Sequence, residues 1–394
     1  MIQFLIILST LFSTFLNVQS LHSMASSEES SMMKAVVASK FGSPDNVLSI
    51  QDMPRPSEDS GSSTSSSKGN NKKPFLILKV HACSLSPGDY RALLGDKSVV
   101  CNPRSWPYIP GGDVCGTVQY ISPTTASTTT AASDFKVGDK VVATWEMWGL
   151  GGLGQYTEVD PRRTVKLPEG VSVWEGAALA NSASHALNMF RCAKIHEGDR
   201  VLVLGGSGGL GTILVQLLKN ANCSYVAATS TDEKLMKELG VDKVVDYTKE
   251  NFYDIPEWQT NKFDCIMDCA VGVQAWKSCS KVLKSGPSGG RYVTAVMNEH
   301  YISIKHYSGI FAFLLPPLCR QMFNGWFWSP TYRVYLGEPS QETMKEVMEL
   351  VSTKKIRVVL DSESPHPFTT QGVRDAWNKH IARKGHGKIV ITVD

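Results

Sequence analysis

The chain has 394 residues, 42% of them hydrophobic, which is enough for two packed domains. Forty basic and 37 acidic residues give a net charge of +3, and no basic run is long enough to bind a phosphate backbone, so nucleic acid is not expected as a partner. Nine cysteines, scattered without CxxC pairs, favour reduced and packed thiols over a disulfide framework. The composition predicts a globular protein of enzyme size.

The N-terminal segment is unlike the rest of the chain. Residues 2–18 are almost continuously apolar, and Val18-Gln19-Ser20 is a small-residue pattern that a signal peptidase can cut. We interpret residues 1–32 as a signal-like or targeting segment, which favours a secretory route. A membrane anchor, an organellar transit peptide, and a cytoplasmic protein that starts at a later methionine are open alternatives, so the sequence leaves the compartment unknown.

Residues 33–174 have the pattern of a small, irregular β-domain. Two stretches rich in Ser, Thr and Gly, at residues 57–73 and 122–133, predict solvated surface insertions. Around them lie short β-rich segments bounded by Gly, Pro or Asp. We expect strands at 35–38, 75–82, 112–120 and 140–143.

From about Asp199, strands and helices alternate along the chain. This alternation predicts a parallel sheet wound on both faces, an α/β fold. We expect its strands at 201–204, 225–229, 244–247, 263–269, 291–296 and 332–336. Residues 338–394 then predict a helix at 341–353, a strand at 356–360, and a last helix and strand.

A glycine-rich turn follows the first strand of this unit. Gly206-Ser207-Gly208-Gly209-Leu210-Gly211 fits the GxGxxG pattern, and a helical sequence comes next. The first glycine allows a tight turn, the second lets the backbone approach a pyrophosphate, and the third allows close helix packing. The free amides of the helix N-terminus favour the same anion. The turn predicts a dinucleotide site.

The end of the second strand indicates which dinucleotide binds. An NAD site has Asp or Glu there to bind the ribose hydroxyls, whereas this chain has Thr229-Ser230-Thr231. Ser230, Lys234 and Tyr247 can donate hydrogen bonds to a 2′-phosphate, which favours NADPH. Asp232 argues against this interpretation, and Lys234 has the alternative role of a solvated helix residue.

With these residues in view, the chain resembles the medium-chain dehydrogenase/reductase superfamily from Met33 to Asp394. The resemblance is to the quinone oxidoreductase branch, in the group similar to reticulon-4-interacting protein 1. It rests on MKAVVASKFGSPDNVLSI, VHACSLSPGDYRALLGD, WPYIPGGDVCGTV, FKVGDKVVA, GGLGQYTEVD, the glycine turn, ELGVDKVVDYTKENF, FDCIMDC and HGKIVITV. It implies a GroES-like β-domain, residues 33–174 with the C-terminal return 338–394, and an inserted Rossmann domain, residues 175–337. The implied site lies between the two domains.

The resemblance also implies a metal-free site. Ser86 stands where the zinc members have a cysteine ligand, and Gly111-Gly112-Asp113 replaces their GHE segment. The closely spaced cysteines of their structural zinc lobe are absent from the sequence. We expect Cys83, Cys101 and Cys115 to be packed thiols and not metal ligands.

Zinc-free members of this branch reduce quinones or the double bond of enones, which implies hydride transfer from NADPH to such an acceptor. Ser86, Tyr90 and His185 are the catalytic candidates. Tyr90 has the alternative of a packing role, and His185 that of a structural histidine. Asn298 and Lys388 are weaker cofactor candidates, carried over by position.

Residues 309–328 are denser in Phe, Leu and Trp than a surface connection needs. Three interpretations are open: a helix buried against its own chain or a dimer partner, an apolar wall for a hydrophobic acceptor, and a patch that touches a membrane. The resemblance implies a homodimer. Two rival functions remain beside the reductase, namely an enoyl-type reductase of lipid or polyketide metabolism and a nucleotide-binding scaffold with little turnover.

Overall fold

The computed structural model describes residues 31–58, 74–96, 106–123, 134–144, 151–286, 289–296, 304, 307–326, 329–335, 337 and 339–393. Almost all of the expected targeting segment and of the two polar insertions lies outside these residues, as do Cys101 and Asn298.

The expected β-domain is built on an antiparallel sheet with strand order β14-β3-β4-β5-β7. Its strands are β3 (Leu76–Ser84), β4 (Asp113–Ile121), β5 (Lys140–Thr144), β7 (Thr164–Lys166) and β14 (Val390–Thr392), with β6 (Tyr156–Val159) paired to β3. A separate hairpin joins β1 (Met32–Ala38) to β2 (Leu48–Pro54). Every strand expected here is present, whereas β2, β6 and β7 were not predicted.

Period-two alternation explains why this sheet has two buried faces. On β3 the side chain of Ala82 joins one apolar core and its neighbour Cys83 joins another, because successive side chains point to opposite faces. The core that contains Ala82 continues into the second sheet through Val201 and Val203. The two domains therefore share one apolar core.

The second sheet is parallel, with strand order β10-β9-β8-β11-β12-β13. Its strands are β8 (Arg200–Leu204), β9 (Tyr225–Thr229), β10 (Lys243–Val245), β11 (Cys265–Asp268), β12 (Arg291–Thr294) and β13 (Thr331–Val334). The order reverses between β8 and β11, as in a doubly wound fold, where the ligand site lies at the carboxyl ends of these strands. The predicted parallel sheet is confirmed.

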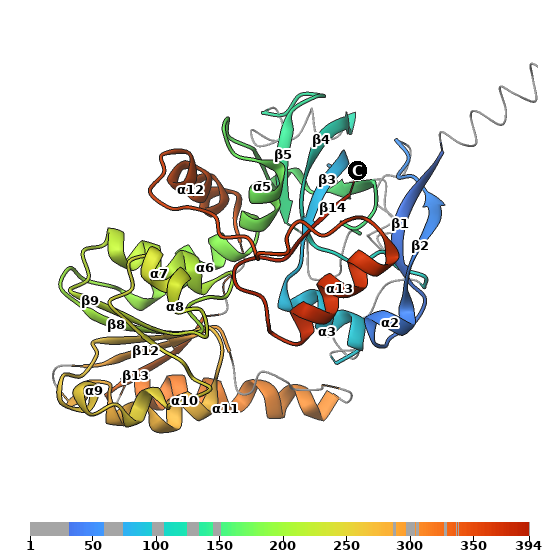
Figure 1. The fold of residues 1–394 in the computed structure, drawn as a ribbon. Helices are drawn as coiled ribbons and strands as arrows, with labels where there is room; N and C mark the ends of the chain where they lie inside the picture. The colour runs from blue at the N-terminus through green and yellow to red at the C-terminus, as the bar shows by residue number, and fades with distance from the viewer. Residues whose placement is uncertain are drawn as a thin grey trace, which may run out of the picture.

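Helices cover both faces of the parallel sheet (Figure 1). One face carries α6 (Ser182–Ala193), α7 (Gly211–Asn220) and α8 (Glu233–Glu238). The other carries α9 (Pro256–Thr260), α10 (Val273–Ser278) and α11 (Tyr307–Trp326). The remaining helices are α2 (Pro44–Val47), α3 (Pro87–Leu94), α5 (Val173–Leu179), α12 (Gln341–Ser352) and α13 (Thr370–Ile381), with short 3-10 turns at Pro161–Arg163, Phe252–Asp254 and Cys279–Lys281.

The strand predicted at 356–360 is wrong. Its backbone does not join a ladder, because the side chain of Gln216 on α7 takes the place of a partner strand: Arg357 N donates to Gln216 Oε1 (2.8 Å) and Gln216 Nε2 donates to Arg357 O (3.0 Å). Only Leu360 forms a bridge, with Lys388. The predicted helix at 341–353 and the closing helix and strand are present as α12, α13 and β14.

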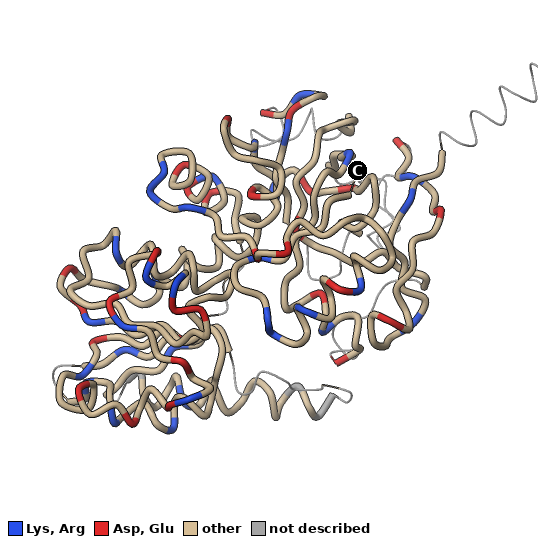
Figure 2. Tube along the Cα trace, in the orientation of Figure 1, with Lys and Arg blue, Asp and Glu red and all other residues tan. Residues whose placement is uncertain are grey.

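The apolar segment 309–328 forms most of α11. The helix extends beyond the sheet, and its projecting end carries no charged residue (Figure 2). Five of its apolar side chains are at least 45% exposed: Phe311, Leu315, Leu318, Met322 and Phe323. This face is not buried against its own chain. Contact with a dimer partner, with a hydrophobic acceptor or with a membrane stays a prediction. Among the described residues, no helix is long and apolar enough to span a membrane.

Candidate functional site

The glycine turn connects β8 to α7 at the carboxyl edge of the parallel sheet. Gly206 N donates to Thr229 O (3.0 Å) and Gly205 N to Thr229 Oγ1 (2.9 Å), so β9 holds the turn in place. A Cβ at Gly211 would stand 2.2 Å from Gly205 O, whereas a Cβ at Gly208 would meet only Gly205 O, at 3.6 Å. Gly211 therefore serves helix packing, and Gly208 leaves its backbone open to a ligand.

The C-terminal segment crosses over this turn. Gly387 N donates to Ser207 O (2.7 Å), and Gly387 and Gly208 form a bridge. A Cβ at Gly209 would stand 2.6 Å from Cδ of Lys388, so the stem of that lysine lies against the glycine turn. Residues about 180 positions apart in the chain thus meet at the edge of the parallel sheet.

The ammonium group of Lys388 reaches into the β-domain. Its Nζ donates to Leu85 O (2.8 Å) and to Ser86 Oγ (3.1 Å), and lies 3.7 Å from Asp113 Oδ2. Ser86 Oγ donates to Asp113 Oδ2 (2.7 Å), and Thr144 Oγ1 donates to Asp113 Oδ1 (2.9 Å). We call Ser86, Asp113, Thr144 and Lys388 the interdomain cluster; all four are buried. The cluster places a hydroxyl and a cation beside the glycine turn.

Burial and charge act in opposite directions on Asp113. Burial raises the pKa of this carboxyl, while the Lys388 charge and hydrogen bonds from Ser86, Thr144 and Asn181 lower it, with a net rise. The neighbouring Asp89 accepts a hydrogen bond from Ser86 N (2.7 Å) through Oδ2, and its Oδ1 has no hydrogen-bond partner among the residues that the structure describes. Burial, followed by the charge of Asp113, raises the pKa of Asp89 to about 7.

Comparison with known proteins matches both parts of the chain. Residues 73–169 match the family described as "Alcohol dehydrogenase GroES-like domain", and residues 239–391 match the "Zinc-binding dehydrogenase" family. The chloroplastic quinone-oxidoreductase homolog of Spinacia oleracea is 31% identical over 335 residues, which cover 81% of this chain and 90% of the relative. The chain belongs to the medium-chain dehydrogenase/reductase superfamily.

Other members of the superfamily are also similar to this chain over most of its length. The chloroplastic NADPH-dependent alkenal/one oxidoreductase of Arabidopsis thaliana is 27% identical over 329 residues (81% of this chain, 72% of the relative). The mitochondrial NAD(P)H oxidoreductase RTN4IP1 of Danio rerio is 27% identical over 345 residues (81% and 83%). The structure of the quinone oxidoreductase from Coxiella burnetii shares the fold at a TM-score of 0.67 and 21% identity, covering 92% of this chain and all of that one. The expected GroES-like domain with an inserted Rossmann domain is confirmed, and the protein is an oxidoreductase.

The donor groups at the position of the superfamily's catalytic zinc do not fit that metal. Zinc sites in proteins are built from thiolates, imidazoles and carboxylates. Here Ser86 offers a hydroxyl, and the carboxylate of Asp113 already faces the Lys388 ammonium, which repels a second cation. Cys83 and Cys115 are fully buried, and burial raises the pKa of both thiols, which disfavours the thiolate that a metal needs.

The residues predicted to bind a 2′-phosphate gather at the ends of β9 and β10. Ser230 is buried, and its Oγ accepts a hydrogen bond from Asp232 N (2.9 Å). Lys234 is exposed on α8, and Tyr247 is exposed just after β10. Because β9 and β10 are adjacent and parallel, Ser230 and Tyr247, which follow these strands, start from the same edge of the sheet.

Two of the predicted catalytic residues lie in packed surroundings. Tyr90 on α3 is 1% exposed and its ring packs edge-on against His380 of α13, 5.3 Å between centroids. His185 on α6 is half-buried, and its Nδ1 lies 3.1 Å from the hydroxyl of Tyr335. Both placements favour the packing alternatives over contact with an acceptor. Ser86 is the predicted catalytic residue that adjoins the glycine turn, through Lys388.

Sequence reasoning did not find every residue that shapes this site. Thr144 and Asn181 bind the carboxylate of Asp113, and no sequence pattern marks either of them. His386 stands beside Thr231, at Nε2 to Oγ1 3.0 Å, although 155 positions separate them. The HGK run next to Lys388 was the one available signal for His386.

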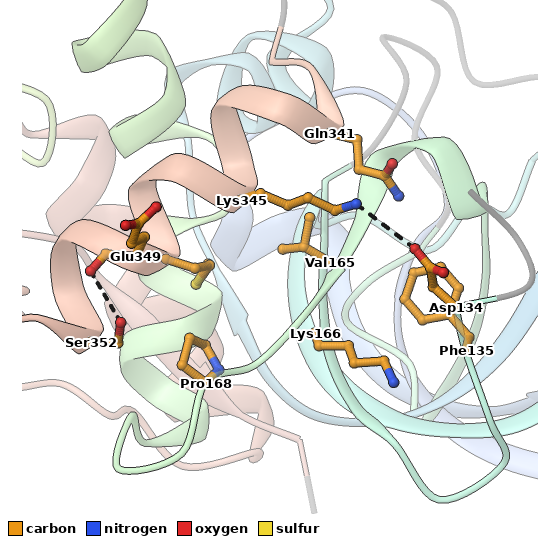
Figure 3. Close-up of a pocket in the computed structure, with 10 residues that line it drawn as sticks. Asp134, Phe135, Val165, Lys166, Pro168, Gln341, Lys345, Glu349 and Ser352 are labelled. Atoms are coloured by element: carbon orange, nitrogen blue, oxygen red, sulfur yellow. Dashed lines mark hydrogen bonds and ion pairs between the residues drawn. The ribbon is translucent and has the colours of Figure 1, made fainter. Parts of the chain in front are cut away.

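A groove of about 470 Å³ lies elsewhere, between strand β7 and helix α12 (Figure 3). Lys345 and Asp134 form an ion pair across it at 3.9 Å, and both side chains are more than half exposed. Such an exposed pair contributes little to stability. None of the residues that line this groove belongs to the glycine turn or to the interdomain cluster, so we do not assign the reaction to it.

Proposed function

We propose that the protein is an NADPH-dependent, metal-independent reductase that transfers hydride to a quinone or an α,β-unsaturated carbonyl compound. The observation that carries this proposal is the contact between the glycine turn and the interdomain cluster through Lys388. A dinucleotide site and a buried polar cluster with a cation adjoin each other at the junction of the two domains. The printed names of the relatives from S. oleracea and A. thaliana support the acceptor classes and the cofactor.

The chain's residues fit a dinucleotide at the glycine turn. The open backbone at Gly208 and the N-terminus of α7, which begins at Gly211, would hold the pyrophosphate. The edge formed by β9 and β10 would hold the 2′-phosphate with Ser230, Lys234 and Tyr247. When bound, NADPH supplies the hydride.

The interdomain cluster would serve the acceptor. Reduction of a quinone or an enone places negative charge on the acceptor oxygen, and preorganised donors lower the energy of that charge in a buried site. The hydroxyl of Ser86 donates its proton to Asp113 in this structure, and the Lys388 ammonium donates to Ser86 Oγ. We assign the oxyanion donor to Ser86 and the supporting positive charge to Lys388.

The rate of NADPH oxidation, measured in parallel with NADH against a panel of quinones, enals and enones, tests the proposal. We expect acceptor-dependent turnover with a preference for NADPH, unchanged after dialysis against a chelator. Ser86→Ala should lower kcat by about tenfold to a thousandfold and leave NADPH affinity intact, because it removes a donor to the developing charge.

The rival functions give different outcomes in the same assay. A nucleotide-binding scaffold would bind NADPH and show no acceptor-dependent oxidation. An enoyl-type reductase would turn over only with acyl thioester acceptors added to the panel. If neither cofactor binds, the assignment of the glycine turn is wrong.

A further inference from the structure

A histidine from the far C-terminal segment lies at the end of β9. Nε2 of His386 lies 3.0 Å from Thr231 Oγ1, and its Nδ1 lies 3.2 Å from Asp232 Oδ2. About one third of each side chain of the His386–Asp232 pair is exposed. The pair therefore stands at the edge where the 2′-position of a bound dinucleotide would lie.

The backbone fixes the position of this histidine. His386 N donates to Asp361 Oδ2 (3.0 Å), and Asp361 in turn accepts from Lys379 Nζ through Oδ1 (2.6 Å). On the other side, Gly387 is tied to Ser207 of the glycine turn. A shift of the backbone at His386 away from β9 would break at least one of these bonds.

Both oxygens of Asp232 already have partners. Oδ1 accepts from Leu235 N (2.9 Å), which makes Asp232 the N-cap of α8, and Oδ2 faces His386. In an NAD site the carboxylate at this place is free to accept the ribose hydroxyls, and a free carboxylate repels a 2′-phosphate. Here the imidazole of His386 lies against Oδ2 of Asp232, the carboxylate oxygen that would otherwise face the ribose.

We propose that His386 determines the preference for NADPH over NADH. Its imidazole occupies the side of the Asp232 carboxylate that would otherwise accept the ribose hydroxyls of NADH and repel a 2′-phosphate. This inference rests on the proposed function, because it concerns the cofactor of the same site. It explains why an acidic residue beside β9 is compatible with NADPH.

Equilibrium binding of NADPH and NADH, each titrated separately and followed by cofactor fluorescence, tests the inference without turnover. We expect His386→Ala to weaken NADPH binding by about tenfold or more, since it exposes the Asp232 carboxylate to the 2′-phosphate, and to leave NADH binding equal or tighter. The double variant His386→Ala/Asp232→Asn should recover much of the NADPH affinity. Asparagine keeps the N-cap of α8, so this rescue isolates the charge.

His196→Ala is the matched control, because His196 also faces an aspartate, Asp199, at 3.7 Å on the Rossmann domain. We expect it to leave the ratio of the two affinities unchanged. An equal loss of affinity for both cofactors in His386→Ala would overturn the inference and leave NADPH binding by the wild type standing. A wild-type protein that binds neither cofactor would instead overturn the proposed function, and this inference with it.

Discussion

Asp89 is a buried carboxyl that is only half satisfied by hydrogen bonds. Oδ2 accepts a hydrogen bond from Ser86 N, and within the described part of the chain Oδ1 has no partner. Burial raises the pKa of this carboxyl to about 7. The folded-state pKa is higher than the unfolded one, near 4, so the folded state binds an extra proton between these pH values. The contribution of Asp89 to stability is therefore largest below about pH 4 and falls as the pH rises towards 7.

Replacement of this carboxyl should flatten the pH dependence of stability. We expect Asp89→Asn, which keeps an acceptor for Ser86 N, to remove roughly 2–3 kcal/mol of the loss in unfolding free energy between pH 5 and pH 8. Urea unfolding of wild type and variant at both pH values measures this. Equal losses in the two proteins would show that Asp89 ionises normally in the folded state.

At the same scale, local sequence patterns predicted the glycine turn but not the polar residues around it. The positions of Gly206, Gly208 and Gly211 could be predicted because their spacing is local. Contacts such as Lys388 to Ser86, 302 residues apart, have no local signal. Tyr90 was singled out by a motif, and the orientation of α3 then placed its ring in the core.

At the scale of elements, two glycines in the turn between β8 and α7 have different roles, one in folding and one in cofactor binding. A Cβ at Gly211 would collide with backbone oxygens of Gly205 and Gly206, at 2.2 and 2.7 Å, whereas a Cβ at Gly208 would make only an ordinary contact with Gly205 O, at 3.6 Å. We expect Gly211→Ala to lower the thermal midpoint clearly. Gly208→Ala should keep the midpoint within about 2 °C, since surface changes cost at most about 0.5 kcal/mol, and weaken NADPH binding.

Differential scanning calorimetry and cofactor titration of both variants measure the two effects. A Gly208→Ala variant with unchanged NADPH affinity would contradict the role of this turn in binding the pyrophosphate.

The strands that could be predicted are those with long, periodic or continuous apolar runs. β6 and β7 have four and three residues and, unlike the equally short β11, contain no continuous apolar run. The segment 356–360 has the composition of a strand, but the side chain of Gln216 bonds the backbone of Arg357, and the segment's contact with residue 388 amounts to a single bridge at Leu360. The composition of a segment does not show whether its backbone bonds a neighbouring strand or a side chain.

At the scale of the whole molecule, Lys388 connects the two domains inside a shared core. Its stem lies on Gly209, and its ammonium is the cation nearest the buried Asp113. Removal of one partner of a buried ion pair leaves an uncompensated charge, at a cost of about 3–5 kcal/mol. We expect Lys388→Met to lose an amount of this order in guanidinium unfolding.

Adding Asp113→Asn to Lys388→Met should restore a large part of the lost stability, because the unpaired charge is then removed. A double variant as unstable as the sum of its two single variants would mean that the two side chains do not interact. In that case the contact between the domains would rest on the apolar core alone.

The overall architecture was accessible from the sequence in two ways. Alternating strands and helices predicted the parallel sheet, since local periodicity reflects burial. The return of the chain to the first sheet, where β14 pairs with β3, came from family resemblance, because pairing across some 300 residues has no local signature.

Transfer of label from NADPH deuterated at both C4 positions to an enone, in chelator-treated buffer, tests the central claim most directly. We predict one deuterium on the β-carbon of the saturated product, formed at the rate of NADPH oxidation and without added metal. Tight NADPH binding with no labelled product from any enone, and no acceptor-dependent oxidation with quinones, would contradict it and favour a nucleotide-binding scaffold.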